Sequence, residues 1–188
     1  MFPHRSAAGE IEQIDPRWLV DTAVLHIPAY GLLTRTARAA ITDAAATVRA
    51  AGGIVTVDLS AITVIQHVGP VELCELLEEL QPRVVFANVD EAEALGLAPR
   101  STARSTARWT TLIKDGRRPA RIVRPDGSVS EVPAEPVAHV RDTTGAGDAF
   151  AGAVLVALQR GEPLEQACVA GHAAAANVLG TLGATGTG

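Results

Sequence analysis

The sequence has few of the residues that build metal centres, disulfide frameworks or aromatic surfaces. Of its 188 residues only two are cysteines, and 3% are aromatic. Cys74 and Cys168 are far apart and lack metal-type spacing, which argues against a disulfide framework or a zinc site. The five histidines show no pairing at helical or strand spacing, so a histidine metal site is not expected.

The sequence also lacks an excess of basic residues and long apolar runs. The formal net charge is −5, whereas a broad surface for nucleic acid or an anionic membrane needs a basic face. The first residues do not contain the apolar segment of a secretory signal, and no run is long enough to span a bilayer. We therefore expect a cytoplasmic protein that binds neither nucleic acid nor membrane.

Three common motifs are missing. There is no Gly-x-x-x-x-Gly-Lys-Ser/Thr motif, no Gly-x-Gly-x-x-Gly motif after the first expected strand, and no Gly-x-Ser-x-Gly motif. These absences argue against a Walker-type NTPase, a dinucleotide-binding Rossmann fold and an α/β-hydrolase.

What is present is an alternation of strand-like and helical segments. Hydrophobic residues make up 47% of the chain, enough to bury a substantial core in a single domain spanning residues 1–188. The alternation predicts an α/β fold, a mostly parallel sheet with helices on its faces. The expected strands are 23–27, 54–58, 84–87, 109–113, 120–124 and 128–132, the last two forming a hairpin. The expected helices are 34–51, a helix beginning at Pro70, 90–95, 148–160 and 163–179.

One stretch, residues 142–152, places a glycine turn and an acid at the start of a long apolar helix. Gly145 and Gly147 can take positive φ and bring bare backbone N–H groups close to a ligand. A helix start offers unpaired N–H donors and a positive dipole end, which favour a phosphate. Asp148 could there accept a proton from a hydroxyl that attacks phosphorus. The residues alone equally fit a second interpretation, in which Asp148 caps the helix and the glycines only turn the chain.

Residues 142–155 resemble the C-terminal signature of the ribokinase-like carbohydrate kinases, the PfkB family. The resemblance implies that Asp148 is the base that deprotonates the sugar hydroxyl. It also implies that Gly145, Ala146 and Gly147 form the anion hole for the transferring phosphoryl group.

Further matches to the family concern metal ions. Asp142 and Thr144 match positions that help bind a monovalent cation such as K⁺ in some members. Asn88 and Glu91 are similar to the family's Asn-x-x-Glu motif near Mg²⁺ and the phosphates. A carboxylate suits that role because Mg²⁺ prefers oxygen ligands. Taken alone, Asn88 could as easily be a helix cap and Glu91 an acid of the first helical turn.

The implied ATP site has further parts. Lys114 and Gly116 resemble the family's strand-then-glycine segment that borders the nucleotide. The family usually has a second glycine in this segment. Here Pro119 stands at that position, which makes the loop stiffer. His172 and Gly183 lie in a segment that resembles the helix and turn closing over the adenine. An Asn is common where His172 stands, so this side chain either touches the base or packs.

The resemblance covers the C-terminal portion of the family fold, from near Ile11 almost to Gly188. We therefore expect a ribokinase-like α/β fold that lacks the N-terminal, lid-bearing portion with the acceptor site. Gly52 and Gly53 stand between a helix and a strand, where they are best explained as a helix stop. A bare sheet edge would remain where strands are missing, which favours a homodimer.

The sequence thus predicts an ATP- and Mg²⁺-dependent kinase that transfers the γ-phosphoryl group to a hydroxyl of a sugar or nucleoside. Two alternatives stay open. The chain could be a truncated nucleotide-binding module with little or no kinase activity, because losing the acceptor half removes the positioning on which the rate depends. It could also be an unrelated α/β protein whose glycine turn binds another phosphate ligand.

Overall fold

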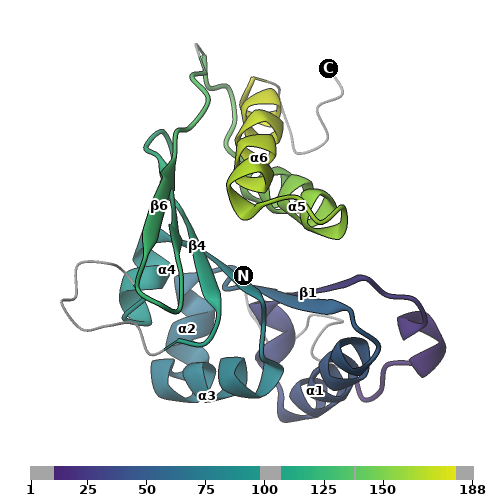
Figure 1. Ribbon diagram of the computed structural model, residues 1–188. Coiled ribbons are helices and arrows are strands. Elements are labelled where there is room, and N and C mark those ends of the chain that lie inside the picture. Colours follow the sequence, from purple (N-terminus) through teal and green to yellow (C-terminus); the bar gives the residue numbers. More distant parts are fainter. Residues whose placement is uncertain (1–10, 98–106, 138, 181–188) are drawn as a thin grey trace. The chain divides into compact units, whose positions relative to one another are not determined.

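The computed structural model describes residues 11–97, 107–137 and 139–180. Six strands form one sheet in the order β1-β2-β3-β4-β5-β6 (Figure 1). The strands are β1 (Val24–Pro28), β2 (Ile54–Asp58), β3 (Val84–Asn88), β4 (Thr110–Lys114), β5 (Ala120–Val123) and β6 (Val129–Val132). The α-helices are α1 (Arg35–Ala50), α2 (Ile62–Val68), α3 (Pro70–Leu80), α4 (Val89–Ala94), α5 (Ala146–Gln159) and α6 (Leu164–Leu179). Two 3-10 helices, η3 (Pro16–Leu19) and η4 (Ala29–Leu32), flank β1.

The strand pairing is the one expected of an α/β fold. β1, β2 and β3 pair in parallel, with Pro28 opposite Asp58. β5 and β6 follow one another through the expected turn, in which Gly127 has a φ of 84° and the N–H of Ser128 donates to Oδ1 of Asp126 at 2.8 Å. The prediction of a mostly parallel sheet with a terminal hairpin is confirmed.

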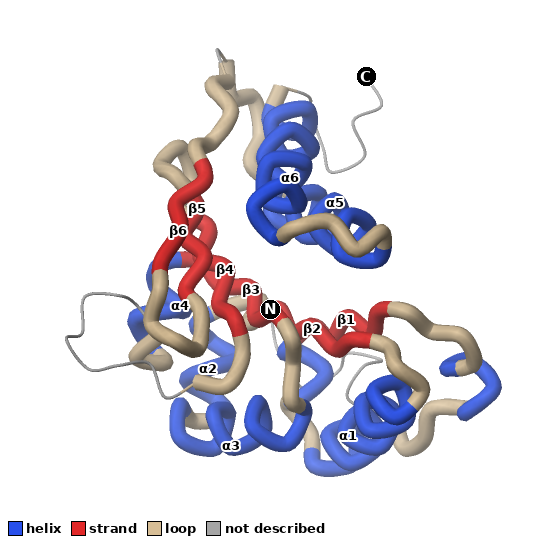
Figure 2. Tube along the Cα trace, viewed as in Figure 1, coloured by secondary structure: helices blue, strands red, loops and turns tan. Residues whose placement is uncertain are grey.

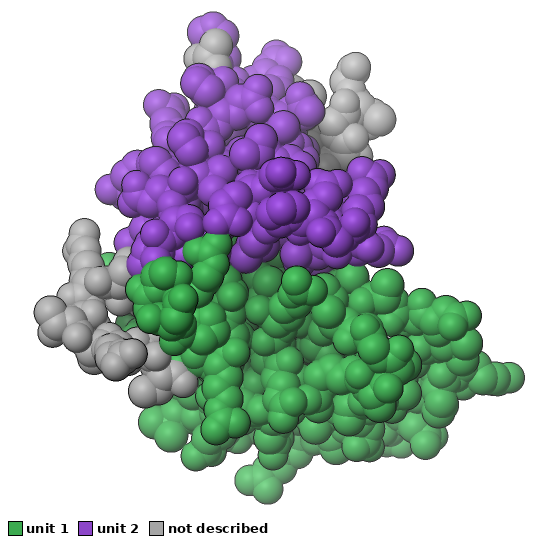
Figure 3. Space-filling model, in the orientation of Figure 1, with its two compact units in different colours: residues 1–113, 123–128 green, residues 114–122, 129–188 purple. Residues whose placement is uncertain are grey.

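The chain divides into two compact units, which are coloured separately in Figure 3. Unit 1 comprises residues 1–113 and 123–128, and unit 2 comprises residues 114–122 and 129–188. Helices α1 to α4 therefore belong to unit 1, and helices α5 and α6 belong to unit 2. The expectation of a single domain stays a prediction.

In unit 1, helices α1 to α4 lie on the same face of the strands β1 to β3 (Figure 2). A single buried cluster contains apolar side chains from these helices and strands. Helix α3 shows how the sequence pattern produces this packing. The leucines that recur at helical spacing are all buried: Leu73, Leu76, Leu77 and Leu80.

Helix α1 begins and ends where the sequence indicates. Thr34 is its N-cap, and the hydroxyl of Thr34 accepts a hydrogen bond from the N–H of Ala37 at 3.3 Å. Gly52 follows the helix with a φ of 87°. A Cβ at Gly53 would lie 2.4 Å from the carbonyl oxygen of Thr22, which no side chain tolerates. The glycine pair is therefore a helix stop with a close backbone contact.

One helix, α2, was not predicted from the sequence. Its seven residues are fewer than the roughly 11 to 18 over which a helical period becomes recognisable. Val64, Ile65 and Val68 nevertheless bury one face of α2 in the core of unit 1. Tertiary packing therefore stabilises a helix whose sequence pattern is too short to predict it.

Helix lengths bear on membrane insertion. Helices α1 and α6 have 16 residues each, whereas a transmembrane helix needs about 20 apolar residues. Across residues 11–97, 107–137 and 139–180, we find no helix with both the length and the apolar character to cross a bilayer.

In unit 2, helices α5 and α6 pack closely against each other. A Cβ on Gly171 of α6 would lie 2.8 Å from a ring carbon of Phe150 on α5, so the glycine permits the close approach. The ring of His172 meets Phe150 edge-on, with 5.1 Å between the ring centroids. The hydroxyl of Ser130 donates to Oε1 of Glu165 at 3.2 Å and joins β6 to α6. These contacts support α5, whose first turn carries the predicted signature.

Candidate active site

The predicted signature lies at the start of α5. Its N-cap residue is Gly145, which has a φ of 79° and supplies no side-chain hydrogen bond. Glycine suits this position because an L-residue with a Cβ adopts the left-handed backbone only at a cost. Gly147, in contrast, lies inside the helix and does not use its ability to take positive φ.

Two backbone N–H groups at this helix start have no hydrogen-bond partner among the described residues. The N–H of Ala146 donates to the carbonyl of Thr143 at 3.3 Å. The N–H groups of Gly147 and Asp148 make no hydrogen bond to any residue that the structure describes. Open donors at the positive end of a helix dipole favour an anion, as the sequence predicted.

Asp148 is the third residue of α5, so it is not the N-cap. Its side chain is exposed, and no hydrogen bond or ion pair connects it to another described residue. The interpretation in which Asp148 merely caps the helix is therefore wrong. The carboxylate is available to accept a proton from a bound ligand.

Lys114 lies beside the same helix turn within unit 2. It ends β4, and its Nζ is 3.8 Å from the position that a Cβ on Gly147 would take. Gly116 follows in the turn after β4 with a φ of 58°. The structure thus brings together a predicted nucleotide-binding lysine and the predicted anion hole.

Asp142 and Thr144 shape the entry into α5. The N–H of Thr144 donates to Oδ1 of Asp142 at 2.9 Å, which forms an Asx turn. Asp142 is half-buried, and Thr144 is exposed. Their role in binding a monovalent cation stays a prediction.

Asn88 and Glu91 form a capping box at the start of α4 in unit 1. Oδ1 of Asn88 accepts from the N–H of Glu91 at 2.9 Å, and Oε2 of Glu91 accepts from the N–H of Asn88 at 2.8 Å. The side-chain amide of Asn88 also donates to Oε1 of Glu91 at 2.8 Å. Glu91 is 3% exposed. The pair therefore has the structural role that the two residues alone allowed, and its role near Mg²⁺ stays a prediction.

The residues predicted to bind metal ions lie in both units. Within the described ranges, no three His, Cys, Asp or Glu side chains are grouped so that they could hold an ion. Asn88 and Glu91 belong to unit 1, whereas Asp142 and Thr144 belong to unit 2. Mg²⁺ in phosphotransferases is commonly held through one or two carboxylates, waters and the substrate phosphates, so few protein ligands are needed.

His172 packs in the core of unit 2 at 9% exposure. Burial lowers the pKa of its imidazole, whereas a hydrogen bond with the backbone of Val132 and the charge of Glu135 oppose this shift. Its Nε2 is buried and has no hydrogen-bond partner in the part of the chain that the structure describes. Contact with the base stays a prediction. Gly183 lies outside the described residues.

Two residues at the carboxyl end of β2 were not singled out from the sequence. Ser60 has a φ of 65°, a strained value for a residue other than glycine. Its N–H donates to Oδ1 of Asp58 at 2.8 Å, and its hydroxyl accepts from the N–H of Ala29 at 3.2 Å. Ligands of open α/β sheets bind beyond the carboxyl ends of the strands. Asp58 and Ser60 are therefore candidate site residues, and the sequence signal for them was a polar strand end.

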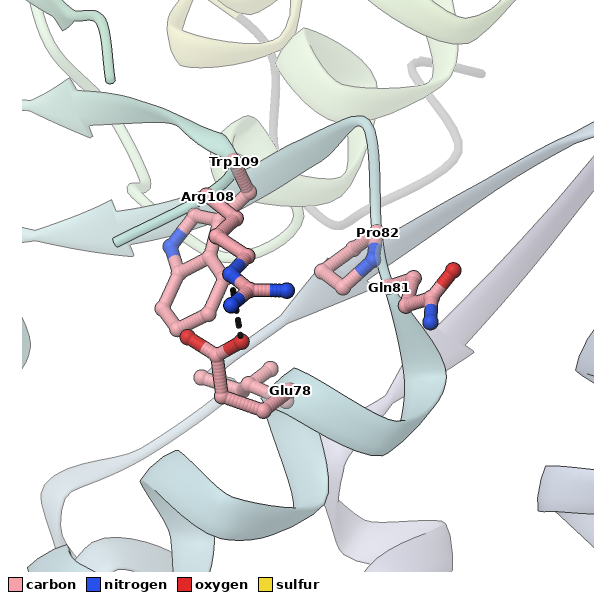
Figure 4. Close-up of a pocket in the computed structure, with 6 residues that line it drawn as sticks. Glu78, Gln81, Pro82, Arg108 and Trp109 are labelled. Atoms are coloured by element: carbon pink, nitrogen blue, oxygen red, sulfur yellow. Dashed lines mark ion pairs between the residues drawn. The ribbon is translucent and has the colours of Figure 1, made fainter. Parts of the chain in front are cut away.

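Unit 1 also has a pocket of about 240 Å³ between the end of α3 and the start of β4 (Figure 4). Its lining residues are Leu77, Glu78, Gln81, Pro82, Arg108 and Trp109. The guanidinium of Arg108 and the carboxylate of Glu78 approach to 3.6 Å at the surface, and exposed pairs of this kind contribute little to stability. None of the predicted site residues lines this pocket.

The comparison with protein families decides between the interpretations of the signature. The model of the family described as "pfkB family carbohydrate kinase" matches residues 3–187. This chain belongs to that family. The resemblance seen in residues 142–155 is thereby confirmed, and the alternative of an unrelated α/β protein is wrong.

Curated relatives of this pfkB-family chain include nucleoside kinases. It is 36% identical over 112 residues to the cytidine kinase of Thermococcus kodakarensis, an alignment that covers 56% of this chain and 40% of the relative. It is 29% identical over 170 residues to the aminoimidazole riboside kinase of Salmonella typhimurium, covering 87% of this chain and 52% of the relative.

Solved structures confirm the ribokinase-like fold. The adenosine kinase of Sinorhizobium meliloti superposes with a TM-score of 0.80 at 26% identity, over 91% of this chain and 53% of that structure. The aminoimidazole riboside kinase of Salmonella enterica, complexed with aminoimidazole riboside and an ATP analog, gives a TM-score of 0.70 at 28% identity, over 92% and 62% of the two chains. The pfkB-family chain spans about half the length of the proteins it matches.

Proposed function

We propose that this chain is an ATP-dependent kinase that transfers the γ-phosphoryl group to a hydroxyl of a sugar or nucleoside. The observation that carries the proposal is the exposed carboxylate of Asp148 beside two open N–H groups at the start of α5. Membership of the pfkB carbohydrate kinase family supports the class of reaction. Relatives named as cytidine, adenosine and aminoimidazole riboside kinases support an acceptor of the sugar or nucleoside class.

The anion hole is formed by the backbone of Gly145, Ala146 and Gly147. The N–H groups of Gly147 and Asp148, which have no described partner, support this role as an anion hole. The helix holds these donors in place before the phosphoryl group arrives. Phosphoryl transfer depends chiefly on positioning and on electrostatic stabilisation of the spread negative charge. A glycine at position 147 keeps this backbone accessible.

Asp148 is the general base. Its carboxylate takes the proton of the acceptor hydroxyl, and the acceptor oxygen forms a bond to the γ-phosphorus. The bond between the γ-phosphorus and the oxygen that bridges it to the β-phosphorus breaks, and ADP leaves with that electron pair. The exposure of Asp148 and the absence of a described partner support this role.

The nucleotide lies along residues from several segments. Lys114 and Gly116 border the phosphates, and His172 and Gly183 border the adenine. The position of Nζ of Lys114 near Gly147 supports the first part. The buried, unpartnered Nε2 of His172 supports the second, because such an atom is usually satisfied by a protein group, a water or a ligand.

Asn88 and Glu91 are proposed to act near Mg²⁺, which would neutralise the charge of the phosphates. Both carboxylate oxygens of Glu91 already accept hydrogen bonds from Asn88. The pair therefore fits a role in orienting water on the ion better than direct ligation. Asp142 and Thr144 are the proposed position of a monovalent cation such as K⁺.

The test is an ATP-consumption assay over a panel of sugars and nucleosides, with the Asp148→Asn variant. We expect the variant to bind ATP as the unchanged protein does and to lose about 10²- to 10⁴-fold in kcat, because the base acts only in the chemical step. Asp43→Asn is the matched control, since Asp43 is an exposed acid on α1. Equal turnover by the Asp148→Asn variant and the unchanged protein would refute the proposed role.

A second candidate function is a nucleotide-binding module with little or no transfer. The open N–H groups at the start of α5 fit nucleotide binding without transfer as well. In that case calorimetry would detect binding of ATP with Mg²⁺, while no member of the panel would be phosphorylated. Turnover of any acceptor that Asp148→Asn abolishes decides for the kinase.

A further inference from the structure

Lys114 is placed to act on the transferred group itself. It is the last residue of β4, and its side chain reaches the first turn of α5 within unit 2. We propose that Lys114 is a catalytic residue whose ammonium contacts the γ-phosphoryl group and stabilises its charge during transfer. This inference rests on the kinase function proposed above and names the group of the substrate that Lys114 contacts.

The geometry places the ammonium where the terminal phosphate would be held. Nζ of Lys114 lies 3.8 Å from the position of a Cβ on Gly147. Gly147 has no side chain, so nothing of residue 147 stands between this ammonium and the bare backbone of the helix turn. The N–H groups of Gly147 and Asp148 on the same turn have no described partner. Backbone donors and an ammonium therefore border the same place.

The charges favour an anion between these groups. The start of a helix carries partial positive charge, and the ammonium of Lys114 adds a full positive charge beside it. A phosphoryl oxygen placed there accepts hydrogen bonds from the backbone and from the ammonium at once.

A lysine at this position should also distinguish ATP from ADP. ATP has the γ-phosphoryl group that the first turn of α5 is proposed to hold, and ADP does not. A lysine is a compact charge on a flexible stem, which can follow the phosphoryl group as it moves toward the acceptor. Contact with the γ-phosphoryl group should therefore strengthen ATP binding and transfer, with little effect on ADP.

The experiment measures the dissociation constants of ATP and ADP with Mg²⁺ by calorimetry for three proteins. These are the unchanged chain, Lys114→Met, and the matched control Arg117→Met, which removes a charge from an exposed position in the following turn. We expect Lys114→Met to weaken ATP binding at least tenfold and to change ADP binding less than twofold. Arg117→Met should change neither by more than twofold, and turnover, where the unchanged chain shows it, should fall in Lys114→Met alone.

The outcomes separate this inference from the function on which it rests. Equal weakening of ATP and ADP, or no weakening of either, overturns the role of Lys114 while the kinase proposal stands. Failure of the unchanged chain to bind any nucleotide overturns the kinase proposal itself. If Lys114→Met does not fold by circular dichroism, Lys114→Arg replaces it. Arginine keeps the charge but not the compact ammonium, so partial retention of ATP selectivity supports the contact, and full loss of binding to both nucleotides contradicts it.

Discussion

Two helix starts in this molecule handle their N–H groups in opposite ways. At the start of α4 in unit 1, the side chains of Asn88 and Glu91 satisfy the donors in a reciprocal capping box. At the start of α5 in unit 2, Gly145 supplies no side-chain cap, and the donors of Gly147 and Asp148 have no described partner.

The difference indicates that the start of α4 has a structural role, whereas the start of α5 is a candidate binding site. Satisfied caps contribute stability, because each orphan donor otherwise gives up a hydrogen bond on folding. A helix start without caps gives up that contribution and leaves its donors available to a ligand. The start of α5 thus gives up local stability at the place where we propose that the phosphoryl group is held.

The largest effect on stability is expected from removing the capping box at the start of α4. Asn88→Ala should lower the free energy of unfolding by about 2 kcal/mol, because it removes the side-chain cap and the hydrogen bond from the Asn88 amide to the buried carboxylate of Glu91. Urea denaturation measures this loss. Asn177→Ala, at an exposed position on α6, should change it by less than about 0.5 kcal/mol. Equal stability of the two variants would contradict the structural role of the capping box.

At the open start of α5, substitution of Gly147 should weaken ligand binding without lowering stability. Gly147→Ala places a methyl group in ordinary contact with Nζ of Lys114, at 3.8 Å, and obstructs the proposed phosphate position. We expect ATP to bind about tenfold more weakly, which corresponds to about 1.4 kcal/mol. The free energy of unfolding should stay the same or rise, since alanine favours helix over glycine.

The matched control for this variant lies in the same helix. Among the described residues, no atom beyond the backbone of the same helix and the neighbouring residues lies within 4 Å of the Cβ position of Gly152. Gly152→Ala should therefore stabilise the protein by up to about 1 kcal/mol without changing ATP affinity. Calorimetry and urea denaturation on both variants give the comparison. Unchanged ATP affinity in Gly147→Ala would show that the first turn of α5 does not hold the phosphate.

A smaller effect on stability is expected at Gly145, the N-cap residue of α5. Gly145 has a φ of 79°, and Gly145→Ala should cost about 1 kcal/mol of stability because alanine is strained in the left-handed region. Gly145→Asn should cost less, because asparagine tolerates this backbone. Thermal unfolding of the three proteins checks the order. Identical melting temperatures would mean that the positive φ is not maintained in solution.

The smallest effect concerns pH and the packing behind α5. Burial lowers the pKa of His172 in the folded protein, so the unfolded chain binds a proton first as the pH falls. The free energy of unfolding should therefore decrease below about pH 6.5 and level off once the pH passes the lowered pKa. His172→Asn should remove this decrease in urea titrations across pH. His67→Asn, at an exposed position on α2, should retain it, and the same slope in both variants would contradict the assignment to His172.

Much of the fold could be predicted because its signals are local. The alternation of apolar strands and helices, the Thr34 cap and the turn at Gly127 each depend on a few neighbouring residues. The predicted strands and helices agree with the structure to within one or two residues at their ends. Helix α2 was not predicted, because its seven residues are too few for a helical period and Ala61 before it is not a capping residue, unlike Asn88 before the six-residue α4.

The candidate site was predicted less completely. The signature located the start of α5, but the sequence left open whether Asp148 was a cap, and only the position of Gly145 as N-cap answered it. Asn88 and Glu91 were correctly identified as a possible cap, because a capping box is a local pattern. Ser60 was missed because its positive φ depends on hydrogen bonds to Asp58 and Ala29, the latter from another segment of the chain.

The α/β class, the family and the helix start that carries the signature could be read from the amino-acid sequence, because these follow from patterns spanning a few residues. The three-dimensional packing was needed to find that Nζ of Lys114 lies beside Gly147, which is 33 positions further along the chain. The burial of His172 against Phe150 was decided in the same way. Contacts between distant segments depend on how whole helices and strands pack, and no local pattern of residues encodes that packing.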